Sequence, residues 1–266
     1  SCLEFPRTKA KEIITVCHLG HLVGHVKGNL LSRFQRTAAK RRLKKADILV
    51  AISKSTANDL LKLGIKKEKI RVIYPGIDFK KFKPRKTRNK KFTIIYPSRI
   101  SKEKGQHIAI EALMRLPKNI LDQIELILAG YVNDFNYLNE LKKLSENLPI
   151  KILTNVSEIE KLYQKADLII FPTLMYEGFG LVAAEALACN KPIIVSDFPA
   201  IREATGDNAI VVKPGSILAL SNAIILLYQN KELREDIAKK GREFVLKNFD
   251  LEKEFNEYVK IYESLR

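Results

Sequence analysis

The sequence contains no tryptophan and only three cysteines among its 266 residues. Cys2, Cys17 and Cys189 are odd in number and lack the spacing of metal ligands, so neither a disulfide framework nor a zinc finger is indicated. No Gly-X-Gly-X-X-Gly motif follows an early strand, which disfavours a dehydrogenase. No Asp-X-Asp pair occurs, so a catalytic divalent ion is not implied.

Long apolar runs are also missing. No run approaches the roughly 20 residues needed to span a bilayer, and no signal-peptide pattern opens the chain. The net charge of +17 suits an anionic membrane surface, a phosphorylated ligand or a solvated lysine-rich surface. Nucleic acid is disfavoured because zinc-finger, RNP-type and GXXG signatures are absent. We expect a soluble, cytoplasmic protein, and the sequence leaves peripheral contact with an anionic membrane open.

Residues 28–46 are a helix candidate with an irregular apolar stripe and many basic side chains. A basic amphipathic helix can lie on anionic lipid. The alternative is a solvated polar face, and the sequence leaves both open. The basic residues are Arg33, Arg36, Lys40, Arg41, Arg42, Lys44 and Lys45.

Strand and helix patterns alternate with short links along the chain. Repeated βα units with apolar strands predict an α/β fold with a doubly wound parallel sheet, whose ligand binds at the carboxyl ends of the strands. The expected strands are 12–18, 47–53, 69–74, 92–97, 124–129, 150–153, 167–171, 192–195 and 209–212. The expected helices are 54–64, 106–116, 137–147, 158–166, one from 216, and 233–266 with a break at 248–250.

Residues 171–187 read as the end of a strand, a glycine-containing turn and a helix start. The unpaired amides and the dipole of such a start attract phosphate or polarised hydroxyls. Gly178 and Gly180 would let the backbone approach that ligand. Glu177 and Glu185 would repel phosphate, so we expect them to accept hydrogen bonds from sugar hydroxyls. The alternative is a glutamate favoured by the dipole plus a solvated helix glutamate.

A second ligand candidate follows the strand at 92–97. The segment Ser98-Arg99-Ile-Ser-Lys-Glu-Lys104-Gly105 offers a planar fork of donors at Arg99 and a point charge at Lys104. Both suit phosphate oxygens, although basic loop residues alone are a weak signal. We expect this loop and the Glu177 turn to meet at one edge of the sheet.

Glu177 and Glu185, with seven residues between them and Gly-Phe-Gly-Leu after the first, resemble the EX7E signature of family-4 (group 1) retaining glycosyltransferases. Residues 190–203 also resemble that family, and the resemblance runs from about Glu12 to the C-terminus. It implies a GT-B fold and transfer of a hexose from a nucleotide diphosphate sugar to a glycan or lipid-linked acceptor, with retention of anomeric configuration. No cofactor and no obligatory metal are implied.

The resemblance also implies roles for single residues. Arg99 and Lys104 would clasp the diphosphate, Glu185 would bind the ribose, and His18 would lie near the far hydroxyls of the sugar. Glu177 would bind the sugar. The backbone amides of the turn would bind it as well, namely those of Gly178, Phe179, Gly180 and Leu181. The turn Pro75-Gly76-Ile77-Asp78 resembles the interdomain crossing, where Gly76 is a substrate-binding candidate. No protein nucleophile is evident, and the leaving phosphate would take the acceptor's proton.

The histidines His18, His21 and His25 allow more than one interpretation. Their spacing could place imidazoles on one helix face for zinc. Glycine at every fourth residue argues against a helix there. The alternatives are a loop that places His18 at the sugar and a purely structural loop.

By this resemblance the chain has three parts. Residues 1–82 would form a partial acceptor-side Rossmann-like domain, 83–248 the nucleotide-sugar-binding domain, and 249–266 a helix that packs back toward the first part. Residues 80–91 read as a linker. We expect the first units of the acceptor domain to be missing. The alternatives are therefore a non-catalytic nucleotide-sugar-binding module, one half of a split enzyme with a complementary N-terminal half, or a GT-B epimerase or phosphorylase.

Overall fold

The computed structural model describes residues 11–17, 19, 22 and 33–265. The chain forms two compact units. Unit 1 consists of Ser1–Gly76, Tyr176–Phe179 and Leu251–Arg266, and unit 2 of Ile77–Met175 and Gly180–Asp250. The expected boundary between the first two domains, at 82/83, lies a few residues beyond the observed division at 76/77. The division into three domains stays a proposal.

Unit 1 contains a three-stranded parallel sheet in the order β1-β2-β3. Its strands are β1 (Ile13–Val16), β2 (Ile48–Ala51) and β3 (Ile70–Val72), and its helices are α2 (Arg33–Lys45), α3 (Lys54–Lys62) and α12 (Leu251–Ser264). Side chains alternate between the faces of a strand. Accordingly Leu49 of β2 packs in a cluster with Leu43 and Leu60, whereas Val50 packs with Ile261.

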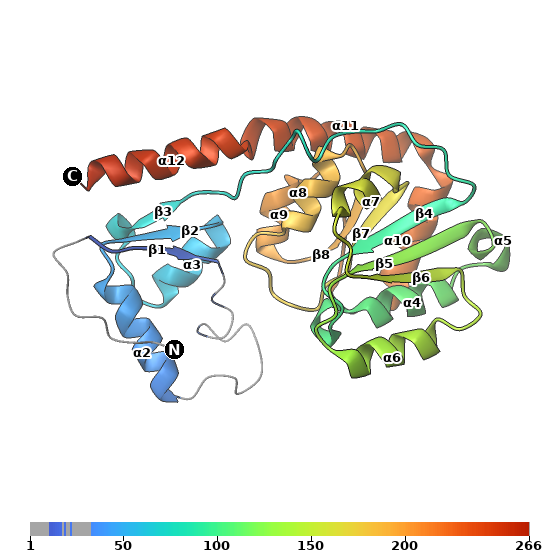
Figure 1. Cartoon of the computed structure of the whole chain (residues 1–266), viewed down its shortest axis with the longest axis horizontal. Helices are drawn as coiled ribbons and strands as arrows, with labels where there is room; N and C mark the ends of the chain where they lie inside the picture. Colours follow the sequence, from blue (N-terminus) through green and yellow to red (C-terminus); the bar gives the residue numbers. More distant parts are fainter. Residues whose placement is uncertain (1–10, 18, 20–21, 23–32, 266) are drawn as a thin grey trace. The chain divides into compact units, whose positions relative to one another are not determined.

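The C-terminal helix α12 is part of unit 1 although it is last in the sequence. Besides burying Ile261, it accepts a hydrogen bond from the Gly76 amide at Glu254 Oε2, over 2.9 Å. The Tyr258 hydroxyl lies 3.1 Å from Thr15 Oγ1 on β1. The sheet is therefore covered by helices from both ends of the chain (Figure 1).

Unit 2 contains a six-stranded parallel sheet in the order β6-β5-β4-β7-β8-β9. The order reverses between β4 and β7, which makes the carboxyl ends of these two strands the topological switch point where ligands bind in such sheets. The strands are β4 (Phe92–Pro97), β5 (Ile124–Gly130), β6 (Ile150–Thr154), β7 (Leu168–Phe171), β8 (Ile193–Ser196) and β9 (Ile210–Val212). Every residue of β7 and β8 is buried, as expected of a sheet covered on both faces.

Helices pack on this sheet in two groups (Figure 1). In one group α4 contacts α6 and α10, and in the other α8 contacts α7, α9 and α11. Their bounds are α4 (Gln106–Met114), α5 (Lys118–Leu121), α6 (Phe135–Leu144), α7 (Ile159–Lys165), α8 (Leu181–Ala188), α9 (Pro199–Thr205), α10 (Ile217–Gln229) and α11 (Lys231–Asn248).

All the expected strands are present, with ends that differ by a few residues. The predicted break at 248–250 is confirmed, because α11 ends at Asn248 and α12 begins at Leu251. Two short helices, α5 and α9, were not predicted. Pro199 suits the first turn of α9, since proline lacks the amide that is unpaired there.

The expected linker at 80–91 is irregular but is bonded to unit 2. The Asn89 side-chain amide donates to the carbonyl of Lys165 at 2.7 Å and to Asp167 Oδ2 at 2.8 Å. Thr87 Oγ1 donates to the carbonyl of Gln164 at 3.3 Å. This segment is therefore attached along the end of α7, which its composition did not indicate.

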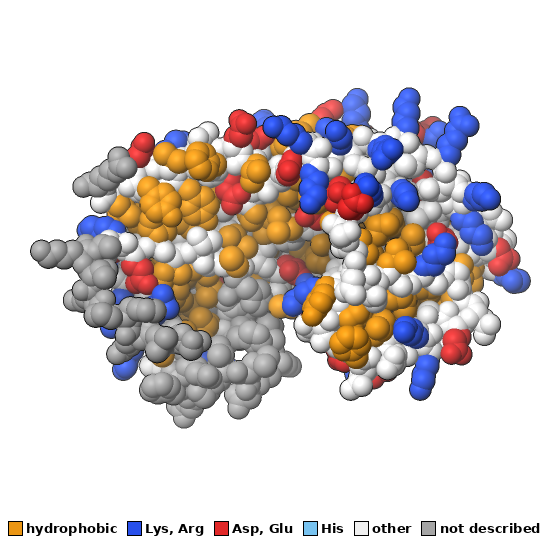
Figure 2. Space-filling model, viewed as in Figure 1, with side chains coloured by type: hydrophobic (Ala, Val, Ile, Leu, Met, Phe, Trp, Pro, Cys, Tyr) orange, Lys and Arg blue, Asp and Glu red, His pale blue; other side chains and the backbone are white. Residues whose placement is uncertain are grey.

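Within the described part of the chain, no helix is both long and apolar enough to cross a membrane. On the face drawn in Figure 2, Lys and Arg side chains lie singly or in small groups among apolar and acidic ones. Some Lys and Arg side chains of the chain form ion pairs, as Lys240 Nζ does with Asp236 Oδ2 at 2.8 Å.

Gly130, the last residue of β5, packs against the loop that leaves β4. A Cβ at this position would lie 2.0 Å from the carbonyl oxygen of Ser98. We expect Gly130→Ala to lower the free energy of unfolding by about 3 kcal/mol, since a backbone carbonyl must move. Gly215→Ala is the matched control. Its Cβ would meet only Leu174 at an ordinary 3.5 Å, so its positive φ of 76° should cost about 1 kcal/mol. Urea unfolding of both variants tests this difference, and equal losses would contradict it.

Candidate functional site

The loop that leaves β4 carries Arg99 and is bonded to the exit of β5. The Ile100 amide donates to the carbonyl of Tyr131 at 2.8 Å. The buried Gln106 at the start of α4 donates from Nε2 to Ser98 Oγ at 2.9 Å and to the carbonyl of Arg99 at 2.7 Å. The backbone of Arg99 is therefore fixed while its side chain is exposed.

Lys104 lies on the same loop and next to the exit of β7. Its carbonyl accepts a hydrogen bond from the buried Tyr96 hydroxyl, and its Nζ lies 5.5 Å from the centroid of the Phe171 ring. The following Gly105 has a φ of 74°, and the Leu174 amide donates to the carbonyl of Glu103 at 3.0 Å. A backbone hydrogen bond thus joins the two loops at the switch point of the sheet.

Glu185 lies on α8, largely buried, and accepts a hydrogen bond from the Tyr163 hydroxyl at 2.7 Å. Burial raises the pKa of its carboxyl group to about 6, while the hydrogen bond from Tyr163 and the charge of Lys81 act in the opposite direction. Tyr163 is itself buried and meets Phe82 edge-on at 5.7 Å. Glu185 is a fixed acceptor that ionises just below neutral pH.

The first part of the motif, Tyr176–Phe179, belongs to unit 1, whereas Gly180 and Leu181 begin α8 in unit 2. The Phe179 ring is buried and lies 5.7 Å from the ring of Tyr74, so it packs in the interior of unit 1. Glu177 stands between anchored residues and is partly exposed.

Packing and backbone conformation require glycine at both positions of the motif, which the sequence alone did not reveal. A Cβ on Gly178 would lie 1.8 Å from the carbonyl oxygen of Cys17. Gly180 has a φ of 105°, and a Cβ there would lie 3.3 Å from Ile201 Cγ1. Close packing and a left-handed backbone therefore require glycine here, independently of any ligand.

The remaining predicted positions are spread over the two units. The Gly76 amide is bonded to Glu254, and Leu181 is exposed at the start of α8. His18, His21 and His25 lie outside the described residues. Among the residues that the structure describes, no cluster of His, Cys, Asp or Glu could hold a metal ion. Arg99, Lys104 and Glu185 share unit 2 with Gly180 and Leu181, while Glu177, Gly178 and Phe179 share unit 1 with Gly76.

Several residues that organise the site were not found from the sequence. Gln106 holds the Arg99 backbone and Tyr163 holds Glu185. Tyr176 bonds to Asp59, far away in the sequence. None of the three stands in a distinctive local pattern, since each acts through a long-range contact.

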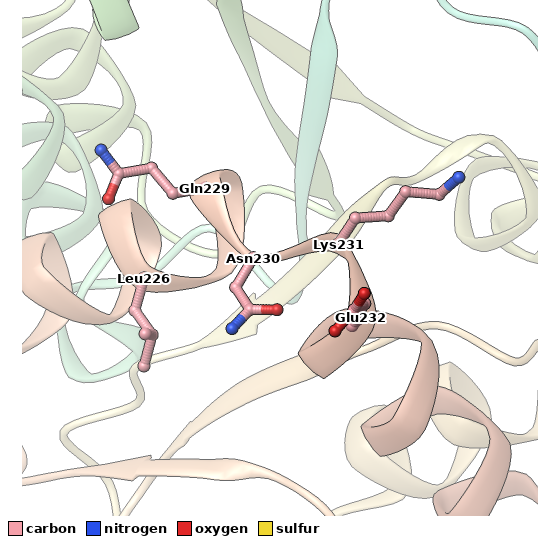
Figure 3. Close-up of a pocket in the computed structure, with 5 residues that line it drawn as sticks. All are labelled: Leu226, Gln229, Asn230, Lys231 and Glu232. Carbon is pink, nitrogen blue, oxygen red and sulfur yellow. The ribbon is translucent and has the colours of Figure 1, made fainter.

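A surface pocket lies at the turn between α10 and α11 (Figure 3). It is lined by Leu226, Gln229, Asn230, Lys231 and Glu232. Nearby, the Tyr228 ring lies 5.3 Å from the ring of Phe92, the first residue of β4. The pocket therefore lies toward the amino ends of the strands, and Asn230 there caps α11 through the Leu233 amide at 2.9 Å.

Residues 78–244 match the family model described as glycosyl transferases group 1. The chain belongs to the group 1 glycosyl transferases. A second model, described as glycosyltransferase family 4, matches residues 3–81.

Curated relatives agree with this assignment. An uncharacterized glycosyltransferase of Methanocaldococcus jannaschii is 31% identical over 97% of this chain and 70% of the relative. The capsular polysaccharide biosynthesis glycosyltransferase CapM of Staphylococcus aureus is 28% identical over 80% of this chain and 62% of the relative. A D-inositol 3-phosphate glycosyltransferase of Paenarthrobacter aurescens is 27% identical over 85% of this chain and 61% of the relative. The aligned regions span only 61–70% of the length of these relatives.

Solved structures confirm the predicted GT-B fold. Anabaena HepE in complex with UDP and glucose superposes with a TM-score of 0.84 at 23% identity, covering 96% of this chain and 72% of that protein. A glycosyltransferase from Rickettsia africae has a TM-score of 0.81 at 25% identity, with 97% and 71% covered.

The environment of Glu185 predicts a pH-dependent contribution to stability. Its pKa is about 6 in the folded chain against an ordinary 4.5, so the folded state binds more protons between these values. The stabilising contribution is fully present below pH 4.5 and is lost as the pH rises through 6. Relative to Glu185→Gln, wild type should therefore lose about 2 kcal/mol of unfolding free energy between pH 4 and pH 8.

Denaturant unfolding at several pH values measures this loss. Glu243→Gln, on the exposed side of α11, is the control for removal of one carboxylate. A difference between wild type and Glu185→Gln that stays constant with pH would contradict the assignment.

Proposed function

We propose that the chain transfers a hexose from a nucleotide diphosphate sugar to a glycan or lipid-linked acceptor, with retention of anomeric configuration. One observation carries the proposal. The Arg99–Lys104 loop is hydrogen-bonded to the exit of β7 at the switch point of the sheet, immediately before the Glu177–Glu185 motif. A nucleotide diphosphate needs cationic groups for its phosphates and a carboxylate that accepts hydrogen bonds from its ribose hydroxyls.

In this proposal unit 2 binds the nucleotide. Arg99 has a fixed backbone and an exposed guanidinium, which donates two hydrogen bonds to the diphosphate. Lys104 adds a second positive charge. Glu185 is mostly ionised at neutral pH and accepts hydrogen bonds from the ribose hydroxyls while Tyr163 holds it. The HepE structures in complex with UDP and with UDP-glucose support UDP as the first nucleotide to test.

The sugar is proposed to bind Glu177 together with the backbone amides of the turn and His18. As the bond to the diphosphate breaks, negative charge grows on the leaving phosphate, and Arg99 and Lys104 stabilise it. The leaving phosphate takes the proton of the acceptor hydroxyl, so no protein nucleophile is assigned. No cofactor or obligatory metal is part of this scheme.

We further propose a cytoplasmic protein whose membrane contact, through the basic helix α2, is at most peripheral.

A second candidate function is a non-catalytic nucleotide-sugar-binding module, or one half of a split enzyme. The observation that favours it is that Arg99, Lys104 and Glu185, the proposed nucleotide ligands, all lie in unit 2. Nucleotide binding without turnover of any donor would favour this candidate over the transferase.

Calorimetric titration with UDP, GDP and ADP tests the nucleotide site. We expect saturable binding of one nucleotide, weakened at least tenfold in Arg99→Ala and in Glu185→Ala, because each removes a charged hydrogen-bond partner worth about 1.5–3 kcal/mol. Glu243→Ala should bind as wild type does. Wild-type affinity in both site variants, or no binding to any of the three nucleotides, would overturn the proposed function.

Turnover of the donor separates the roles of the two cations. We expect Arg99→Ala to reduce nucleotide release from the donor sugar about a hundredfold with an unchanged melting temperature, since its side chain is exposed. Lys104 is only 7% exposed, so Lys104→Ala should lose stability as well, whereas Lys104→Met keeps the apolar packing and loses the charge. Full turnover in both Arg99→Ala and Lys104→Met would exclude these residues from the chemistry.

A further inference from the structure

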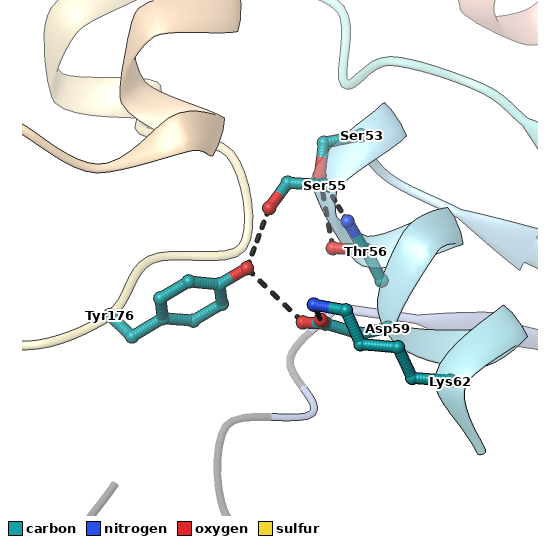
Figure 4. A network of polar contacts seen from close by, with 6 residues as sticks. All are labelled: Ser53, Ser55, Thr56, Asp59, Lys62 and Tyr176. Atoms are coloured by element: carbon teal, nitrogen blue, oxygen red, sulfur yellow. Dashed lines mark hydrogen bonds and ion pairs between the residues drawn. The ribbon is translucent and has the colours of Figure 1, made fainter. Parts of the chain in front are cut away.

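The motif segment Tyr176–Phe179 is bonded to helix α3 through a partly buried polar network (Figure 4). The Tyr176 hydroxyl lies 2.6 Å from Ser55 Oγ and donates to Asp59 Oδ2 at 3.1 Å. A carboxylate can only accept hydrogen bonds. The single Tyr176 proton is therefore used on Asp59, and Ser55 must donate to the tyrosine oxygen.

Asp59 is a fixed partner for this hydroxyl. It is 1% exposed, and its second oxygen, Oδ1, pairs with Lys62 Nζ at 3.2 Å. Ser53 caps α3 by accepting a hydrogen bond from the Thr56 amide at 2.9 Å, which sets the first turn of the helix. A buried carboxylate that loses a hydrogen-bond donor is destabilised, so Asp59 and Tyr176 hold each other in place.

The residues that follow Glu177 are anchored in the same unit. Thr56 Oγ1 donates to the carbonyl of Gly178 at 3.3 Å, and the Phe179 ring is buried beside Tyr74. Glu177 thus has Tyr176 fixed before it and Gly178 fixed after it. Its backbone position is set by both neighbours.

We propose that Tyr176 and Asp59 are positioning residues that hold Glu177 where it meets the donor sugar. This inference rests on the proposed function, in which Glu177 contacts the sugar. A displacement of about 1 Å in a positioned group can lower a rate about a hundredfold. The network acts on unit 1 residues, whereas Arg99 and Glu185 of unit 2 bind the nucleotide. Loss of the network should therefore reduce kcat and leave the affinity for the nucleoside diphosphate unchanged.

The test compares wild type with Tyr176→Phe and Asp59→Asn, both close in size to the native side chains. Tyr258→Phe is the matched control, because it also removes a tyrosine hydroxyl bond in unit 1 but lies on α12. Three quantities are measured: the Kd for UDP, GDP and ADP, the release of nucleotide from the corresponding glucose, galactose, mannose and N-acetylglucosamine donors, and hydrogen exchange of the segment 175–180.

For Tyr176→Phe and Asp59→Asn we expect kcat to fall about tenfold or more, nucleotide Kd to stay within twofold, and exchange of 175–180 to rise at least tenfold. The double variant should be no worse than the worse single variant, since both act through one bond. Tyr258→Phe should match wild type in all three measurements.

Hydrogen exchange needs no ligand, so it tests the network even where turnover is absent. Unchanged exchange in both variants would overturn the inference, and so would faster exchange with wild-type kcat, which would show a purely structural contact. A wild-type chain that binds none of the three nucleotides would instead overturn the proposed function.

Discussion

The site in unit 2 depends on the hydrogen bonds that hold the loop after β4 at the reversal point of the sheet. The Leu174 amide donates to the carbonyl of Glu103, and the Tyr96 hydroxyl donates to the carbonyl of Lys104. Parallel strands end at one edge, and ligands of such sheets bind where the strand order reverses. The two bonds give the cationic loop a fixed base, so the charge of Arg99 can be held without burying its guanidinium.

The two glutamates of the motif occupy very different environments. Glu185 is largely buried beside a tyrosine hydroxyl, and desolvation raises its pKa to about 6. Glu177 stands partly exposed in a segment that is held from both sides by unit 1. One sequence motif thus supplies a carboxylate whose ionisation is tuned by burial and another whose position is set by its neighbours. Glycine at 178 and 180 serves the same purpose, since packing against Cys17 and a positive φ both fix the path of the backbone.

Much of the fold could be predicted because its signals are local. Apolar runs such as Ile193–Ser196 mark buried parallel strands, and Asn248 to Asp250 mark the break between the last two helices. The short helices α5 and α9 were missed, because a helix of four or seven residues has too few turns to show a period. The attachment of residues 80–91 was missed because its partners, Gln164, Lys165 and Asp167, lie far along the chain.

The sequence by itself determined the α/β class, the family resemblance and the candidates Arg99, Lys104, Glu177 and Glu185, since these depend on residue type and spacing. Only the tertiary structure decided how those residues are held. Three hydrogen-bonded pairs of residues that stand in no distinctive pattern hold the site: Tyr163 with Glu185, Gln106 with the Arg99 carbonyl, and Tyr176 with Asp59. Burial and hydrogen-bond geometry depend on which distant segments the fold brings together, and no local pattern of residues records that.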